Sequence, residues 1–282
     1  MFKQAFKNNF FLTKEFADFC SKITGIKYKK LGNYYILKNR NISISNYDGI
    51  ERTGFQRNNI SYMAVLPELN NGSIMEYSLF NKKSYASAYK NYKKSFRKHL
   101  NQGRKYNYKT EIIRKLDKNL LNQIYPIYVK QMKRHNSAIF SKSFFIEFMK
   151  LPSLLFLIKL NNEIAAYSFC FKNKDNLYTS IGGGNPKYFK NRCVNILYDE
   201  RIKYACKNKL NIHSGIGTKN SGYNKFKEDA GILNYKTERY PDDTKLIKKA
   251  LKLTKFKIFG LFLIIFSKLF PKKVIYRIIP FS

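Results

Sequence analysis

Three short apolar runs joined by tight polar turns constrain the fold of this chain more than any other feature. The runs are Leu154–Leu160, Ile164–Phe171 and Leu177–Ile181, and each has the length of a strand. Asn161-Asn162-Glu163 and then Asn173–Asn176 separate them. Connections this short join antiparallel neighbours, so the pattern predicts an antiparallel meander with tight hairpins.

The segment after the meander predicts a parallel strand pair. Gly182-Gly183-Gly184-Asn185-Pro186 leads into a helix expected at about Arg192–Lys207, and strand Leu210–Ser214 follows. Strands joined through a crossover helix pair in parallel. A Gly-containing loop, a short helix around Tyr223–Asp229 and a strand Ile232–Arg239 complete the order β-β-β-α-β-α-β. On the crossover helix, Asp199 and Glu200 are expected at the surface, in ion pairs with the neighbouring Arg201 and Lys203.

Helices precede this core. Residues 84–103 read as one basic helix closed by Gly103, because aromatic residues recur every three or four positions. Further elements follow from the same periodicities: helices Leu12–Ile23, Asn119–Arg134 and Ser143–Lys150, and strands Tyr34–Leu37 and Ile60–Leu66. The predicted fold class is α/β (α+β), with a mixed, mostly antiparallel sheet flanked by helices.

The net charge is extreme and has two interpretations. The 282 residues carry 54 Lys and Arg against 18 Asp and Glu, a formal charge of +36. Such a charge attracts an anionic partner, either nucleic acid or the inner leaflet of a membrane. The alternative is a solvated lysine coat without a target, because the lysines spread through the whole chain and cluster only in the last forty residues.

Cysteines and histidines give no sign of a metal site. The four cysteines have no CxxC spacing and lie in apolar contexts, which favours reduced, buried thiols of a cytosolic protein. The three histidines are equally scattered, so we expect no metal. No apolar stretch follows the basic N-terminus MFKQAFKNNFF, and we expect no signal peptide.

Short sequence motifs in the core resemble those of a known family. The hairpin Asn162–Ala166, the turn Pro186–Tyr188 and the helix ending at Ala205 stand in the order of the core of Fem-type and related GNAT-like acyltransferases. The segment HSGIGTKNSGYNKFKEDAG resembles the family's glycine loop and its YxxFKxxFG element. The matching residues are Gly215, Gly217, Tyr223, Phe226, Lys227 and Gly231. Upstream, KKSFRKHLNQGRKYNYKTEII resembles the basic helix and strand that open the same domain.

The resemblance covers roughly residues 85–240 and implies a GNAT-like fold with three parts. Residues 81–241 form the GNAT-like catalytic domain. Residues 1–80 correspond to a degenerate N-terminal GNAT-like subdomain, because Fem-type proteins carry two such halves. Residues 242–282 are a basic amphipathic tail that associates with membranes.

Three residues are the catalytic candidates. The resemblance implies Lys227 and Tyr223, whereas His213, at the end of a central strand, stands where the family often has an acidic residue. Lys227 would stabilise the tetrahedral oxyanion or neutralise an acceptor phosphate, and Tyr223 would protonate the leaving group or hold the acceptor. His213, whose usual pKa is near ~6.5, would take the proton of the attacking amine. A solvated lysine, a packing tyrosine and a core histidine are the ordinary alternatives. The candidates are expected to line one pocket.

The donor-binding loop departs from the family pattern. The acetyl-CoA signature Q/R-x-x-G-x-G/A presents backbone N–H groups to the pyrophosphate, whereas the corresponding segment Tyr188–Val194 has no glycine. Lys190, Arg192, Cys193, Val194 and the helix N-terminus remain the candidates for binding acyl-CoA, with acetyl-CoA as the simplest donor. Gly182–Gly184 is either a phosphate cradle or a site of close strand packing.

The tail at residues 245–282 predicts a partner. Its apolar run Ile258–Phe266 is shorter than the ~20 residues a spanning helix needs, and the preceding LIKKALKLTKFKIF is cationic and amphipathic. This favours a helix on the anionic inner membrane surface, with a core-covering helix as the alternative.

Together these features predict a cytoplasmic enzyme, peripheral on the inner face of the membrane. It would transfer an acyl group from acyl-CoA to an amine on a cell-envelope precursor or surface glycan, so its partners include an amine-bearing glycan or lipid-linked acceptor. Two alternatives stay open: an aminoacyl-tRNA-dependent Fem-type aminoacyltransferase, with tRNA as partner, and a non-catalytic basic protein that binds membrane or nucleic acid on a degenerate GNAT scaffold.

Overall fold

The computed structural model describes residues 10, 13–24, 27–31, 34–39, 42–48, 60–64, 73–81, 83–135, 139–217 and 222–240. The chain divides into two compact units. Unit 1 comprises Met1–Phe10, Glu76–His135 and Ile139–Tyr235, and unit 2 comprises Phe11–Met75, Asn136–Ala138 and Lys236–Ser282. The tail at 245–282 lies outside the described residues, and the origin of residues 1–80 as a degenerate half stays a prediction.

Unit 1 is built on a mixed, mostly antiparallel sheet with the strand order β11-β5-β10-β9-β8-β7-β6. The strands are β5 (Ser73–Phe80), β6 (Lys109–Ile113), β7 (Ser153–Leu160), β8 (Glu163–Lys172), β9 (Asn176–Gly184), β10 (Asn211–Gly217) and β11 (Leu233–Tyr240). The helices are α3 (Tyr85–Lys90), α4 (Lys94–Arg104), α5 (Lys118–Arg134), α6 (Lys142–Phe148), α7 (Cys193–Lys207) and α8 (Gly222–Asp229). The predicted fold class is confirmed.

Unit 2 contains a smaller set of strands. They are β1 (Tyr28–Leu31), β2 (Tyr34–Asn39), β3 (Ile42–Asp48) and β4 (Ile60–Ala64), and they follow helix α2 (Lys14–Thr24). The first three strands pair antiparallel, β3 and β4 pair in parallel, and residues 238–240 of β11, which belong to unit 2, pair antiparallel with β4. The predicted helix at 12–23 and the strands that start at residues 34 and 60 are therefore present.

The meander of β7, β8 and β9 is antiparallel, as predicted. The first hairpin turns at Asn161 and Asn162, whose φ angles are 52° and 64°. A two-residue turn with both angles positive matches the twist of the strands, and asparagine tolerates this conformation better than most residues. The Asn-Asn pair thus fixes the register of the hairpin.

The crossover through α7 is also as predicted, because β9 and β10 pair in parallel. Their register covers only three positions, from Asn176–Asn211 to Tyr178–His213, although β9 continues to Gly184 and β10 to Gly217. Beyond these positions the described ladder between the two strands ends. The central strands of unit 1 therefore separate toward their C-terminal ends.

The glycine run belongs to β9, although the sequence pattern ended that strand at Ile181. An added Cβ on Gly183 would collide with the Gln131 side chain, and one on Gly184 would lie 2.7 Å from Phe189. The glycines therefore permit close packing on the strand. This is the second of the two interpretations given to them.

Residues 84–103 form two helices where the periodicity predicted one. The break at 91–93 turns the Tyr92 ring inward, where its hydroxyl donates to Asp199 Oδ1 at 3.0 Å. Ser84 caps the first helix by accepting a hydrogen bond from the Ser87 N–H. The aromatic stripe runs across the break, so periodicity alone did not reveal it.

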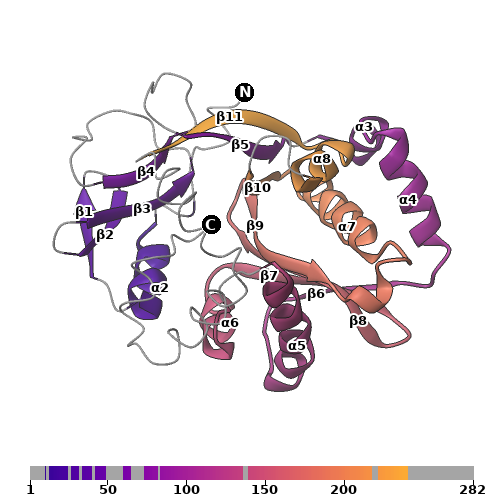
Figure 1. Cartoon of the computed structure of the whole chain (residues 1–282), viewed down its shortest axis with the longest axis horizontal. Coiled ribbons are helices and arrows are strands. Elements are labelled where there is room, and N and C mark those ends of the chain that lie inside the picture. The colour runs from indigo at the N-terminus through magenta and orange to yellow at the C-terminus, as the bar shows by residue number, and fades with distance from the viewer. Residues whose placement is uncertain are drawn as a thin grey trace. The chain divides into compact units, whose positions relative to one another are not determined.

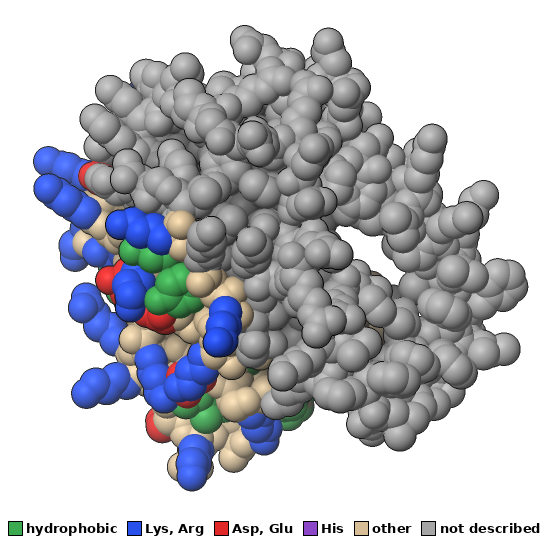
Figure 2. All heavy atoms as spheres, turned by 90° about the vertical axis from the view of Figure 1, so that its left-hand side faces the viewer, with side chains coloured by type: hydrophobic (Ala, Val, Ile, Leu, Met, Phe, Trp, Pro, Cys, Tyr) green, Lys and Arg blue, Asp and Glu red, His purple; other side chains and the backbone are tan. Residues whose placement is uncertain are grey.

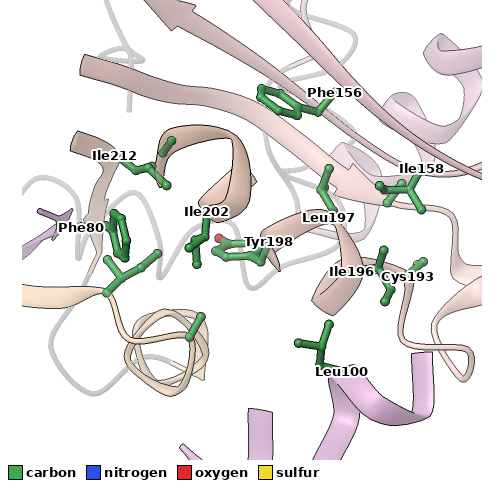
Figure 3. Close-up of a cluster of buried hydrophobic side chains, with 14 of the residues drawn as sticks. Phe80, Leu100, Phe156, Ile158, Cys193, Ile196, Leu197, Tyr198, Ile202 and Ile212 are labelled. Carbon is green, nitrogen blue, oxygen red and sulfur yellow. The ribbon is translucent and has the colours of Figure 1, made fainter. Parts of the chain in front are cut away.

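Each face of the unit 1 sheet has its own apolar core, with α7 on one face and α5 and α6 on the other (Figure 1). On the α7 face, Phe156 of β7, Phe80 of β5 and Ile212 of β10 gather around Tyr198 and its neighbours (Figure 3). On the opposite face, rings of α6 pack against β8; the pairs are Phe145–Phe169, Phe148–Phe169 and Phe148–Phe171.

Candidate functional site

Tyr223 and Lys227 lie one turn apart on α8 and are in direct contact. The Lys227 ammonium is 4.2 Å from the centre of the Tyr223 ring, a cation–π distance. Lys227 is fully buried, at 0% exposure, and donates a hydrogen bond of 3.1 Å to Ser78 Oγ on β5. The structure thus brings two of the three predicted catalytic residues together, and it does not leave Lys227 on a solvated face.

The Tyr223 hydroxyl points inward although the residue as a whole is 54% exposed. Its oxygen lies 2.9 Å from the hydroxyl of Tyr198 on α7, which donates to it. Desolvation, together with the neighbouring Tyr198, raises the pKa of Tyr223 well above its usual value. The hydroxyl therefore keeps its proton at neutral pH and can donate a hydrogen bond.

Arg201 adds a third polar group that the sequence pattern did not identify. It is 5% exposed, its guanidinium carbon lies 4.0 Å from the centre of the Tyr198 ring, and Nη1 donates to Ser168 Oγ at 3.2 Å. Sequence reasoning treated it as a surface partner for Asp199. Its spacing of three residues from Tyr198 on one helix is the one sequence signal that it lies beside the ring of Tyr198.

His213 lies on the opposite face of the sheet. Its neighbour in β10, Ile212, belongs to the α7 core, and successive strand residues point to opposite faces. The imidazole stacks on Tyr178 at 4.4 Å, and Nε2 is 3.0 Å from Asn176 Oδ1. Ser78 and Phe80 are two residues apart in β5, so both point to the face that α7 covers. Lys227 donates to Ser78 and therefore lies on the α7 face. The structure does not bring His213 to the other two candidates.

Replacing His213 with asparagine is expected to lower stability and leave the pH profile of any transfer activity unchanged. The change removes a buried ring from Tyr178 and its hydrogen bond to Asn176, at a cost of about 1–3 kcal/mol. Urea unfolding measures the loss. His135 gives the matched control, because it is an exposed histidine at the end of α5. A shifted pH profile with unchanged stability would return His213 to the role of base.

The residues predicted to bind acyl-CoA have different surroundings in the loop before α7. Lys190 is exposed, while the Nε of Arg192 donates to Gln102 at 3.1 Å. The side chains of Cys193 and Val194 turn toward Gly184. Arg192 itself has φ 64°, the left-handed conformation that glycine adopts most easily. The segment therefore bends as a glycine loop does, and the helix N-terminus follows it directly.

A buried carboxylate joins α7 to the helices before it. Asp199 was expected on the helix surface, but it is 1% exposed. Its Oδ1 accepts from the hydroxyls of Tyr85 and Tyr92, at 2.8 and 3.0 Å. Its Oδ2 lies 3.1 Å from both Arg104 and Lys203. Burial and Asp199 raise the pKa of both tyrosines, so they remain donors.

Three further observations concern the described part of the chain. No group of three or more His, Cys, Asp or Glu side chains within it is arranged to hold a metal ion. Among the described helices, none is long and apolar enough to cross a membrane. Lysine and arginine side chains project from much of the described surface in the view of Figure 2.

A mixed sheet whose central parallel pair separates, with a crossover helix and basic helices before it, is the arrangement of the GNAT-like fold. The sequence agrees: residues 87–228 match the family described as acetyltransferase (GNAT) domain. The match spans half of the chain. The protein belongs to this family.

Solved structures share the fold at low sequence identity. FemX matches with a TM-score of 0.62 and 10% identity over 87% of this chain and 96% of that chain. L-PGS from Bacillus licheniformis matches with a TM-score of 0.54 and 10% identity, over 82% and 89%. The C-terminal domain of a putative lysylphosphatidylglycerol synthetase from Agrobacterium fabrum matches with a TM-score of 0.44 and 10% identity, over 58% of this chain and 59% of that chain. No curated protein matches the sequence.

Proposed function

We propose that the chain is an N-acyltransferase that moves an acyl group from acyl-CoA to an amine on a cell-envelope precursor or surface glycan. The observation that carries the proposal is the contact between Lys227 and Tyr223, directly after the strand that separates from β9. A buried cation and a protonated hydroxyl on one short helix suit an oxyanion and a leaving group.

The chemistry needs few groups from the protein. The amine attacks the thioester carbonyl, the C–N bond forms, and the oxyanion that develops is stabilised by the ammonium of Lys227. When the C–S bond breaks, the hydroxyl of Tyr223 donates to the departing sulfur. His213 lies on the other face and has no part in this scheme, so the proton of the amine leaves to solvent. Positioning then supplies most of the rate.

The segment 190–194 supports an acyl-CoA donor. The exposed ammonium of Lys190 and the N-terminus of α7 fit a diphosphate, and the left-handed backbone at Arg192 gives the turn that a glycine gives elsewhere. The Arg192 guanidinium is held by Gln102, so we assign it a positioning role. Because a side chain stands where glycine is usual, we expect weak binding.

Isothermal titration of the full chain with acetyl-CoA and longer acyl-CoA tests the donor. We expect millimolar binding that weakens several-fold in Lys190→Ala and stays unchanged in Lys187→Ala, an exposed lysine that pairs with Glu163. No binding at millimolar acyl-CoA together with tight binding of a charged tRNA would replace the donor by aminoacyl-tRNA. Salt-sensitive RNA binding without any transfer would favour the non-catalytic alternative.

The acceptor and the place of action rest on the sequence. The Fem-type resemblance and the basic tail at 245–282 support an envelope acceptor, reached from the anionic inner face of the membrane. The metabolite or lipid-linked intermediate that accumulates when the gene is deleted would identify this acceptor.

A further inference from the structure

Arg201 is a buried cation without an acidic partner. Its guanidinium stacks on Tyr198 and donates through Nη1 to Ser168, both uncharged groups. Nε has no hydrogen-bond partner, and no described Asp or Glu lies within ion-pair distance of the guanidinium. The Nε–H, on the edge of the guanidinium that Nε and Nη2 form, is thus a buried donor without a partner.

Asp199, the other buried charged residue of α7, does have partners. Asp199 is equally enclosed, yet two cations and two hydroxyls satisfy its carboxylate. A buried charge without a partner destabilises the folded state strongly, because desolvation is not offset. Methionine would fill the position of Arg201 without this penalty. A bound anion would supply the partner that the guanidinium lacks.

The position of Arg201 ties it to the proposed site. The Tyr198 ring that it covers carries the hydroxyl that donates to Tyr223 at 2.9 Å. Ser168, its hydrogen-bond partner, pairs in register with Gly182 on the part of β9 that has separated from β10. Arg201 therefore lies on the α7 face of the sheet. It contacts Tyr198, which in turn contacts Tyr223, the proposed leaving-group donor.

We infer that Arg201 binds a carboxylate of the acceptor, so that the acceptor class is an amine that also carries a carboxylate, as amino acids and peptides do. This inference rests on the proposed transfer function. Carboxylate is favoured over phosphate because its two coplanar oxygens match the Nε–Nη2 edge and its single charge balances one guanidinium. The unmet Nε–H is the group that the ligand satisfies.

The test uses the full chain and small probes that differ only in charge. Acetate, acetamide and inorganic phosphate are titrated at constant ionic strength, and the arginine Nε–H resonances and the unfolding temperature are recorded. Arg201→Met removes the proposed site and also assigns its resonance. Arg97→Met is the matched control, because Arg97 is an exposed arginine on α4.

We expect acetate to shift the Arg201 Nε–H resonance and raise the unfolding temperature of the wild-type and Arg97→Met proteins, whereas acetamide does neither. Arg201→Met should bind acetate about 10–100-fold more weakly, the loss expected for a charge-assisted hydrogen bond. Without acetate, this variant should unfold at the same temperature as the wild type or above it. Equal effects of acetate and acetamide, or a strongly destabilised Arg201→Met that still responds to acetate, would overturn the site.

Two outcomes separate this inference from the proposed function. Arg201-dependent acetate binding in a protein that never transfers an acyl group would refute the transferase proposal and the acceptor class, and leave an anion site. Rapid transfer to amines without a carboxylate, unchanged in Arg201→Met, would refute the inference and keep the transferase. A stronger, Arg201-dependent response to phosphate would overturn the choice of carboxylate.

Discussion

Lys227→Ala is expected to lower the rate constant for acyl transfer by about 10²–10³-fold, the usual loss when one charge-stabilising contact at an oxyanion is removed. The ammonium is fully buried between Tyr223 and Ser78, where the local dielectric is low. An attraction to a developing negative charge is strong in such a place. Single-turnover rates measure the effect on the chemical step. They are recorded with saturating acyl-CoA and with the acceptor that the gene-deletion experiment identifies.

Two neighbouring substitutions calibrate this result. Lys225→Ala removes an exposed lysine from the same helix and should leave the rate within about twofold. Tyr223→Phe removes only a hydroxyl and should lose less than Lys227→Ala while it retains its fold. The unfolding temperature of each variant is needed, because Lys227 is buried. A rate that falls only in proportion to the folded fraction would make Lys227 a structural residue.

The core topology could be predicted because its signals are local. Asn161 and Asn162 between two apolar runs specify a hairpin, and a helical pattern between strands specifies a parallel crossover. Even the β-β-β-α-β-α-β order needed no knowledge of tertiary packing. The break at residues 91–93 was missed because its cause, the hydrogen bond from Tyr92 to Asp199, joins residues that are far apart in the sequence.

The position of His213 could not be predicted from pattern. Residues 211–214 are all buried, because helices or aromatic rings cover both faces of the sheet at β10. A strand buried on both sides has no polar face from which to read direction. Strand alternation does separate His213 from Ile212, but only the contact of Ile212 with the α7 core reveals which face is which.

The buried charges of α7 were missed for a related reason. Nine of its residues are buried, including Asp199 and Arg201, so the helix is enclosed on most sides. A charged residue on such a helix looks, in the sequence, the same as one on a solvated face. The Asp-Glu-Arg sequence at 199–201 suggested surface ion pairs, and only Lys203 pairs as expected, with both Asp199 and Glu200.

The stability of unit 1 is expected to depend on this enclosed carboxylate, and Asp199→Ala should lower the free energy of unfolding by about 3 kcal/mol. The substitution leaves the hydroxyls of Tyr85 and Tyr92 without an acceptor, at roughly 1–3 kcal/mol each when buried. The ion pairs with Arg104 and Lys203 add little, because those cations are 40% and 38% exposed and each pair is worth about 0–1 kcal/mol.

Glu200→Ala is the control for this prediction, since Glu200 is the adjacent residue and, within the described part of the chain, forms an ion pair only with the partly exposed Lys203. It should lose under about 1 kcal/mol. Urea unfolding followed by circular dichroism compares the two variants, with tyrosine fluorescence as a second probe because the chain has no tryptophan. If Asp199→Ala costs no more than Glu200→Ala, the two tyrosine hydroxyls find other acceptors, and Asp199 does not hold α3 and α4 against α7.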